Sequence, residues 1–92
     1  MKAIWNDQIL AESNETIVIK NNHYFPPSSL NLEYFTESET TTICPWKGTA
    51  NYYTIAVGSE KNEDAAWYYP LPKEAASEIR NYVAFWRGVN IT

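Results

Sequence analysis

Turn-forming residues divide this chain into short segments, and their spacing limits the folds open to it. Turn signals recur about every ten residues along the sequence. The segments between them are rich in β-branched and aromatic residues, most clearly at Thr16–Ile19. The pair Asn6-Asp7 tolerates positive φ and predicts a tight hairpin between residues 3–5 and 8–12. The pattern is typical of many short antiparallel strands.

The middle of the chain predicts two longer strands joined at a proline turn. Residues 32–43 alternate in polarity with the period of a strand. Cys44 precedes a proline, which favours extended backbone there, so we expect the strand to end at this cysteine. Pro45 sets φ for the turn, and Gly48 can adopt the left-handed conformation that closes it. A second strand is then expected to run through residues 50–57.

The last third of the chain predicts two more strands and a single helix. Residues 58–64 are polar and indicate a hairpin loop, which a strand at 65–69 follows. Pro72 suits a first helical position, and the apolar spacing after it predicts one short helix near residues 73–80. Residues 82–92 are expected to close the chain as a strand.

Together these segments predict a mainly β fold with little helix. We expect a small, strongly bent antiparallel sheet or partial barrel of about six to eight short strands. No internal repeat or linker divides the sequence, so residues 1–92 are expected to form one domain.

Composition excludes several classes of partner. The formal net charge is −4 and the seven basic residues are scattered, whereas a phosphate backbone requires clustered cations, so no nucleic-acid partner is expected. No apolar run has the length of a signal peptide or a membrane span. A single cysteine cannot form an internal disulfide, and we expect a soluble, cytoplasmic protein.

The segment Thr41–Tyr53 concentrates chemistry that a plain turn does not need. Cys44, Trp46 and Lys47 stand within four consecutive positions. Each has an ordinary interpretation: a small buried thiol for Cys44, a lid over a thin core for Trp46, and a solvated charge or an ammonium group over an indole for Lys47. Aromatic walls around one fixed cation are instead typical of a pocket for a small anionic or planar ligand. The expected ligand-binding residues are Trp46, Lys47, Tyr52, Trp67, Tyr69 and Tyr24.

Several short motifs, in this order and spacing, resemble the domain-of-unknown-function family 427. They are Tyr24-Phe25-Pro26, Cys44-Pro45-Trp46-Lys47-Gly48, Ala50 with Tyr52, Ala66-Trp67 with Tyr69, and Ala84-Phe85. The resemblance covers nearly the whole chain and implies a small β-rich domain of uncharacterised function that has also carried a nucleotidyltransferase-like label. Many members of the family place charged residues after Tyr-Phe-Pro, where this chain has Pro27-Ser28-Ser29.

Metal and nucleotidyl chemistry find little support in the residues present. Nucleotidyl transfer needs two or three carboxylates that converge on a metal, and the only aspartates are Asp7 and Asp64. A closed zinc site needs four ligands, and Cys44 and His23 are the only residues of the two usual types. We therefore expect no metal site and no cofactor.

Three functional hypotheses remain open on this sequence. The first is a small-molecule binding module that uses Lys47 as the anion partner. The second is an enzyme that uses Cys44 in thiol, acyl or nucleotidyl chemistry, with His23 as a candidate base and Lys47 lowering the pKa of the thiol. A histidine in a polar turn is more often a solvated side chain. The third is a protein-interaction module, monomeric or homodimeric, with exposed aromatics and strand edges.

Overall fold

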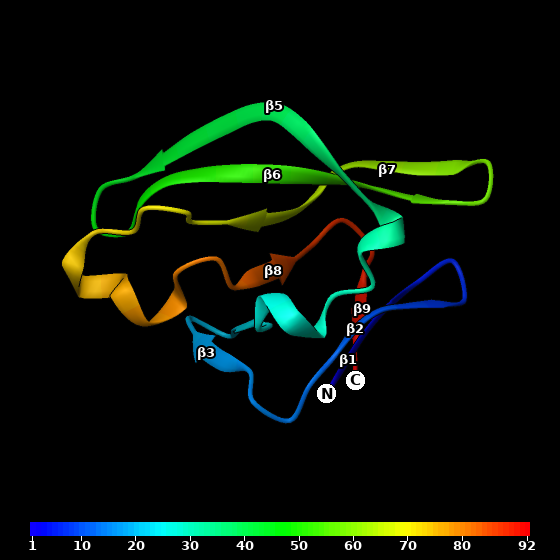
Figure 1. Ribbon diagram of the computed structural model, residues 1–92, viewed down its shortest axis with the longest axis horizontal. Coiled ribbons are helices and arrows are strands. Elements are labelled where there is room, and N and C mark those ends of the chain that lie inside the picture. The colour runs from blue at the N-terminus through cyan, green and yellow to red at the C-terminus, as the bar shows by residue number, and fades with distance from the viewer.

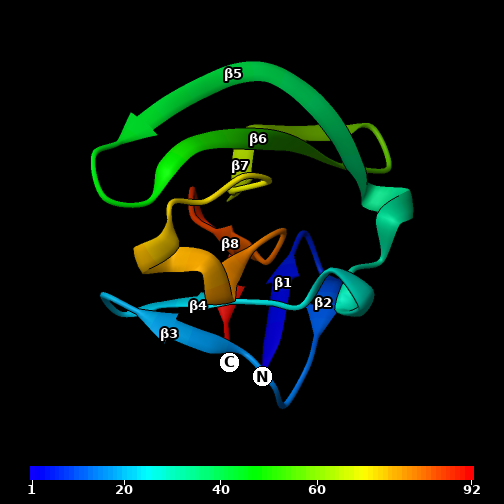
Figure 2. The ribbon, with the colours of Figure 1, turned by 60° about the vertical axis from the view of Figure 1, so that its left-hand side comes forward.

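The computed structural model describes residues 1–92 and confirms the mainly β fold class. Strand makes up 58% of the chain and helix 13%, and nine strands form three antiparallel sheets that do not close into a barrel. In both Figures 1 and 2 the long strand β5 arches over the molecule, and the chain ends lie together on the opposite side. The strands are β1 (Lys2–Trp5), β2 (Gln8–Glu12), β3 (Ile17–Ile19), β4 (Asn22–Tyr24), β5 (Phe35–Cys44), β6 (Gly48–Val57), β7 (Glu60–Tyr68), β8 (Val83–Phe85) and β9 (Asn90–Ile91).

The three-stranded sheet has the order β2-β1-β9 and contains the predicted hairpin. Asn6 and Asp7 connect β1 to β2 with φ of 50° and 62°, the left-handed values that a two-residue hairpin turn requires. Strand β9 pairs with β1 on its other side, and Lys2 exchanges two backbone hydrogen bonds with Thr92 at 2.8 and 2.9 Å. The hairpin prediction is confirmed.

The four-stranded sheet has the order β5-β6-β7-β8 and carries the proline turn. Strand β5 ends at Cys44 and β6 begins at Gly48, as the sequence predicts. Gly48 has φ of 112°, so the left-handed conformation expected of this glycine is present. Strand β5 is an edge of the sheet, and most of its side chains are exposed.

Four local predictions differ from the structure. The closing strand is divided into β8 and β9, because positive φ at Arg87 (54°) and Gly88 (86°) turns the chain between them. Residues Leu32–Tyr34 form the 3₁₀ segment η2 instead of the start of β5, because the backbone N–H and side chain of Asn31 are tied to β2. Residues Glu60–Asp64 belong to β7 and not to a loop, since their polar side chains face solvent while their backbone pairs with β6. The predicted helix is the short 3₁₀ segment η3 (Glu74–Ile79), interrupted at Ala76, where φ is −121°.

A third 3₁₀ segment, η1, covers Pro27–Ser29 and has a proline at its first position. None of the helical segments has the length and apolar character that would be needed to cross a membrane.

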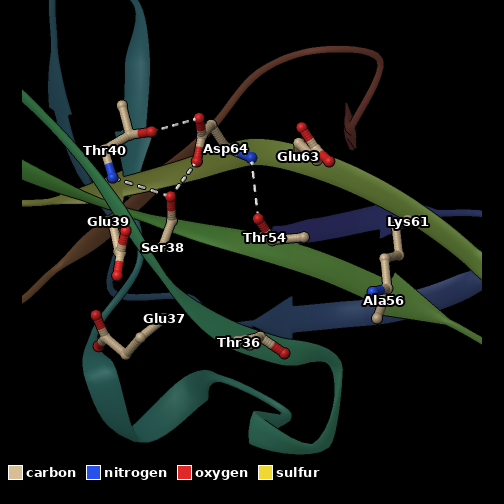
Figure 3. Close-up of a pocket in the computed structure, with 10 residues that line it drawn as sticks. All are labelled: Thr36, Glu37, Ser38, Glu39, Thr40, Thr54, Ala56, Lys61, Glu63 and Asp64. Atoms are coloured by element: carbon tan, nitrogen blue, oxygen red, sulfur yellow. Dashed lines mark hydrogen bonds between the residues drawn. The ribbon is translucent and has the colours of Figure 1, made fainter.

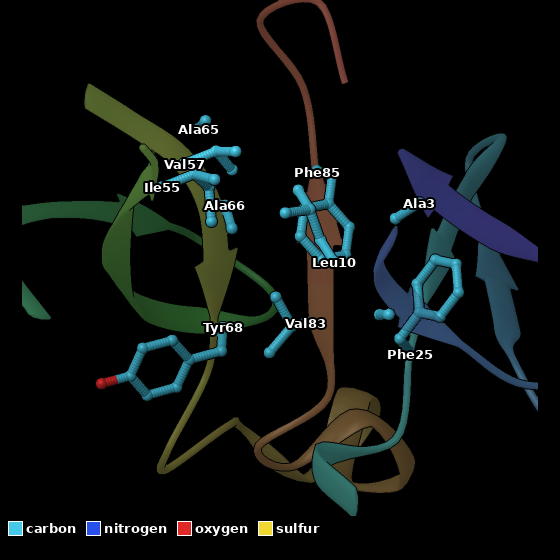
Figure 4. Packing of buried hydrophobic residues seen from close by; sticks show 11 residues of the cluster. Ala3, Leu10, Phe25, Ile55, Val57, Ala65, Ala66, Tyr68, Val83 and Phe85 are labelled. Carbon is cyan, nitrogen blue, oxygen red and sulfur yellow. The ribbon is translucent and has the colours of Figure 1, made fainter. Parts of the chain in front are cut away.

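The main hydrophobic core lies between the four-stranded and three-stranded sheets. Figure 4 shows Phe85 of β8 between side chains of β6 and β7 on one side and Ala3 and Phe25 on the other. Phe25 also exchanges two backbone hydrogen bonds with Val83, at 2.8 and 2.9 Å, which joins the end of β4 to the outer side of the edge strand β8. The cluster contains Ala3, Leu10, Ala11, Phe25, Ile55, Val57, Ala65, Ala66, Tyr68, Val83 and Phe85.

A second, smaller core lies beneath the hairpin of β3 and β4 and against η3. Its buried members are Tyr24, Ala50, Tyr69, Ala76, Ile79 and Ala84. Cys44, Tyr52 and Trp67 pack against it while partly exposed. This second core supports the segment that the sequence marks as a candidate site.

Candidate functional site

The turn from Cys44 to Gly48 is held against the segment that precedes η3. The backbone N–H of Lys73 donates to the carbonyl of Lys47 at 2.8 Å, and Lys73 Nζ donates to the carbonyl of Pro45 at 2.7 Å. A Cβ atom on Gly48 would lie 3.4 Å from the backbone oxygen of Leu71, so the two segments are in close contact. These contacts fix the direction in which the Lys47 side chain leaves the backbone.

Lys47 is buried and not a solvated charge, and its ammonium lies over the indole of Trp46, as the other ordinary interpretation of this residue implies. Its exposed fraction is 7%, and it is the only charged residue in the buried set. Its Nζ donates a hydrogen bond to the hydroxyl of Tyr24 at 3.1 Å. The same atom lies 5.1, 5.4 and 5.9 Å from the ring centroids of Trp46, Tyr24 and Tyr69. No carboxylate forms an ion pair with it.

A pocket of about 210 Å³ opens beside this ammonium group. Its walls are aromatic, Lys47 supplies the one cation, and no acidic side chain contributes to it. The lining residues are Lys47, Tyr52, Trp67, Tyr69 and Trp86. Four of these five are among the residues predicted from the sequence. Their place around one pocket is a finding, whereas ligand binding by them stays a prediction.

Trp86 is the pocket residue that the sequence reasoning missed. The alternation of β8 places it on the same face as Ala84, and Ala84 is paired directly with Trp67 in the sheet. That pairing could have marked Trp86 as a neighbour of Trp67, but it requires knowledge of the strand order. The two indole rings meet edge to face with centroids 6.0 Å apart.

The nitrogen atoms of the two pocket tryptophans are already engaged. Trp67 Nε1 donates to the hydroxyl of Tyr24 at 3.3 Å, beside the bond from Lys47. Trp86 Nε1 donates to the carbonyl of Asp64 at 2.6 Å, and the guanidinium of Arg87 lies 4.6 Å from the ring centroid. Neither indole therefore has a donor left for a ligand, and both present ring surface.

The hydroxyl groups in the pocket differ in their partners. Tyr52 shares a hydrogen bond of 2.9 Å with Thr42. The Tyr69 hydroxyl has no partner within the protein, and since every fully buried side-chain polar atom has one, this hydroxyl retains access to solvent. Burial, then the neighbouring acidic groups of Tyr24, Cys44 and Tyr52, raise the pKa of Tyr69 to about 12. Tyr69 therefore stays a neutral donor at physiological pH.

Two predicted ligand residues do not line the pocket itself. Trp46 is 36% exposed and covers Lys47 from outside, where its ring also lies 5.8 Å from Lys20 Nζ. Tyr24 is fully buried, and its hydroxyl accepts a hydrogen bond from the Lys47 ammonium group. Both hold Lys47 in place instead of facing the pocket.

Cys44 is partly buried beside the same turn and is a free thiol. Burial acts to raise the pKa of this thiol, but the backbone N–H groups of Lys47 and Trp46 and the charges of Lys47 and Lys20 outweigh it and lower the pKa below its ordinary value. The candidate base His23 is engaged elsewhere, because its Nδ1 is hydrogen bonded to Thr16 at 2.9 Å. No hydrogen bond joins His23 to Cys44.

A second hollow, of about 380 Å³, lies at the bend of β5 and is strongly polar. Figure 3 shows Asp64 held there by Ser38 and Thr40, whose hydroxyls donate to its two carboxylate oxygens. These hydrogen bonds, from Ser38 first and Thr40 second, lower the pKa of Asp64. No group of three or more His, Cys, Asp or Glu side chains is arranged to hold a metal ion. The hollow is larger than the aromatic pocket but contains no buried charge without a partner.

Asp64 nevertheless connects this hollow to the aromatic pocket. The residue has φ of 55° at an irregularity in the pairing of β6 and β7. Its backbone carbonyl, turned out of the ladder, accepts the indole N–H of Trp86. The hydroxyls of Ser38 and Thr40, which bind the Asp64 carboxylate, thus help to fix the Trp86 ring that lines the aromatic pocket.

Comparison with known proteins adds a family without adding an activity. Residues 1–91 match the family model described as "Domain of unknown function (DUF427)". No curated protein matches the chain.

Proposed function

Because this chain belongs to the DUF427 family, whose function is unknown, we propose a role from its own site: the pocket beside Lys47 binds a small anion. The observation that carries the proposal is the buried ammonium without a carboxylate. Charges in protein interiors are nearly always paired, because removal from water costs several kcal/mol per ion. A ligand anion would supply the partner that the protein omits.

The aromatic contacts of Lys47 offset only part of that cost. Ring faces and a phenol oxygen attract an ammonium group, but neither carries a full negative charge. The ammonium donates one of its three protons to Tyr24, so two remain for other acceptors. The free hydroxyl of Tyr69 adds another donor in the same pocket. This donor set is complementary to an anion.

The size of the pocket limits the ligand. Its volume of about 210 Å³ is below the ~300–1,000 Å³ that is typical of sites for drug-sized molecules. The proposed ligand is therefore small, and four aromatic rings provide its walls.

The test is a thermal unfolding series with small anions on the wild type and two variants. Acetate, inorganic phosphate and benzoate, each at matched ionic strength, should raise the Tm of the wild type if any of them binds the folded state. Lys47→Met should abolish the increase. Lys61→Met is the matched control, since it removes an exposed lysine that does not line the aromatic pocket and should retain the response.

Two results would count against the proposal. One is a wild type whose Tm none of the anions changes. The other is an equal response in Lys47→Met and the wild type, because the effect would then arise at another place on the surface.

A second candidate function uses Cys44 as a nucleophile, and the lowered pKa of its thiol favours it. The alternative is independent of His23, which is bound to Thr16. Reaction of Cys44 with iodoacetamide under native conditions tests it. If the thiol reacts only after the protein unfolds, Cys44 is a packing residue and not a nucleophile.

The remaining parts of the proposal concern the cellular location of the protein and its protein partners. A lone thiol such as Cys44 is compatible with a reducing compartment. For that reason we propose that the protein is cytoplasmic. A role in protein interaction or homodimer formation stays a hypothesis, which the oligomeric state in solution would test.

A further inference from the structure

We infer that the ligand class of the aromatic pocket is a flat aromatic monocarboxylate, of which benzoate is the simplest probe. The inference rests on the proposed function and specifies it. Its three supports are the charge in the pocket, the hydrogen bonding of the walls, and the fixed position of Trp86.

The charge in the pocket favours a monoanion. Lys47 is the only cation that lines the pocket, and it is 93% buried, since its exposed fraction is 7%. The guanidinium of Arg87 is directed away from this role, because it lies on the ring of Trp86 and donates to the carbonyl of Glu63 at 3.1 Å. A doubly charged phosphate would leave one negative charge unpaired in a partly desolvated site, which is costly. One carboxylate balances one ammonium.

The walls favour an unsaturated hydrocarbon body over a sugar or another polar ligand. Both indole N–H groups are bound to protein oxygens, and the Tyr52 hydroxyl is bound to Thr42. The remaining donors, Lys47 and Tyr69, can serve the two oxygens of one carboxylate. A ligand with many hydroxyl groups would find no partners for them, and unpaired polar groups weaken binding. The rest of the pocket wall consists of the surfaces of aromatic rings.

The position of Trp86 favours a planar ligand in particular. The ring is 44% exposed, yet the bond to Asp64, the Arg87 guanidinium and the edge of Trp67 hold it in one orientation. A ring fixed before binding loses little conformational entropy when a ligand stacks on it. A flat aromatic ligand gains more from such a surface than a puckered ring of similar size.

The experiment measures the affinities of four probes for the full chain by tryptophan fluorescence or calorimetry at neutral pH. Benzoate is the expected ligand, cyclohexanecarboxylate has the charge without the flat ring, benzamide has the ring without the charge, and inorganic phosphate is the competing anion. Benzoate should bind about 2- to 10-fold more tightly than cyclohexanecarboxylate, the range that aromatic stacking adds to apolar contact. Benzamide and phosphate should bind more weakly than benzoate.

A variant separates the ring preference from the charge. Trp86→Leu keeps an apolar side chain at an exposed position and should lose part of the preference for benzoate over cyclohexanecarboxylate, because three aromatic rings still line the pocket. Lys47→Met should bind neither carboxylate. A folded Trp86→Leu protein, checked by its thermal transition, that keeps the full benzoate preference would overturn the role of Trp86.

The outcomes distinguish this inference from the broader proposal. If phosphate or cyclohexanecarboxylate binds as tightly as benzoate, the pocket is an anion site but not one for flat aromatic acids. If benzamide equals benzoate, the charge of Lys47 has no part in recognition. If no probe binds, the anion-binding proposal fails together with this inference.

Discussion

Replacement of Lys47 by methionine tests the energetic premise of the site in the absence of any ligand. The exchange preserves an unbranched side chain of similar length and removes the buried charge. It leaves no polar group without a partner, because the Tyr24 hydroxyl still accepts the indole N–H of Trp67 at 3.3 Å. The measured difference therefore reports on the ammonium group itself.

The contacts of the ammonium indicate the size and sign of the effect. Three ring contacts contribute ~0.5–2 kcal/mol each, and a hydrogen bond from a charged donor contributes ~1.5–3 kcal/mol. Against them stands a desolvation penalty of several kcal/mol for an ion removed from water, and no opposite charge in the protein offsets it. We expect Lys47→Met to raise the free energy of unfolding by about 1 kcal/mol, or Tm by ~4–8 °C.

The assay is thermal and urea unfolding of the unliganded protein, followed by circular dichroism. Lys61→Met is the control, since Lys61 is exposed and its replacement should change stability by no more than ~0.5 kcal/mol. A loss of about 2 kcal/mol or more in Lys47→Met, the size of a damaging core substitution, would refute the reasoning. The aromatic surroundings would then stabilise the charge without any need for an anion.

Three further predictions concern the residues around the site. Gly48→Ala should lower stability by ~1–2 kcal/mol in urea unfolding, because an alanine at φ of 112° is strained; an unchanged midpoint contradicts this. Asp64→Asn should lower stability at neutral pH but not in strong acid: the folded-state pKa of Asp64 lies below its ordinary 3.8, so its stabilisation is complete above that value and is lost as the pH falls through the folded pKa. Equal pH profiles for the two proteins would refute the assignment. The alkylation rate of Cys44 should rise at lower pH in the wild type than in Lys47→Met, because the Lys47 charge favours the thiolate; coincident pH profiles speak against that coupling.

The strand pattern and its turns could be predicted because their causes are local. Asn6-Asp7 and Gly48 adopt the left-handed conformations that their side chains, or the lack of one, permit. The course of residues 32–34 and 60–64 could not, because tertiary contacts decide it. Asn31 binds strand β2 and turns the chain into η2, and β6 supplies a partner for the polar start of β7.

The residue types of the candidate site could be predicted from the sequence, but the burial of its lysine could not. The turn at Cys44 and the alternation of the following strands predict that Lys47 and several aromatic rings come together. Burial of the ammonium depends on Tyr24, which lies on a different sheet and reaches Lys47 only through the pairing of Phe25 with Val83. The position of Trp86 in the pocket wall depends in the same way on the pairing of β7 with β8.

The most direct test of the account follows the Lys47 ammonium itself by NMR. In protein labelled on lysine, the ε-CH₂ signal of Lys47, assigned by its absence in Lys47→Met, is observed during a titration with benzoate. We predict that this signal shifts to saturation while those of the other four lysines stay in place. A titration in which Lys47 does not move, or in which Lys20 or Lys73 moves instead, would contradict the claim that the buried cation binds an anion.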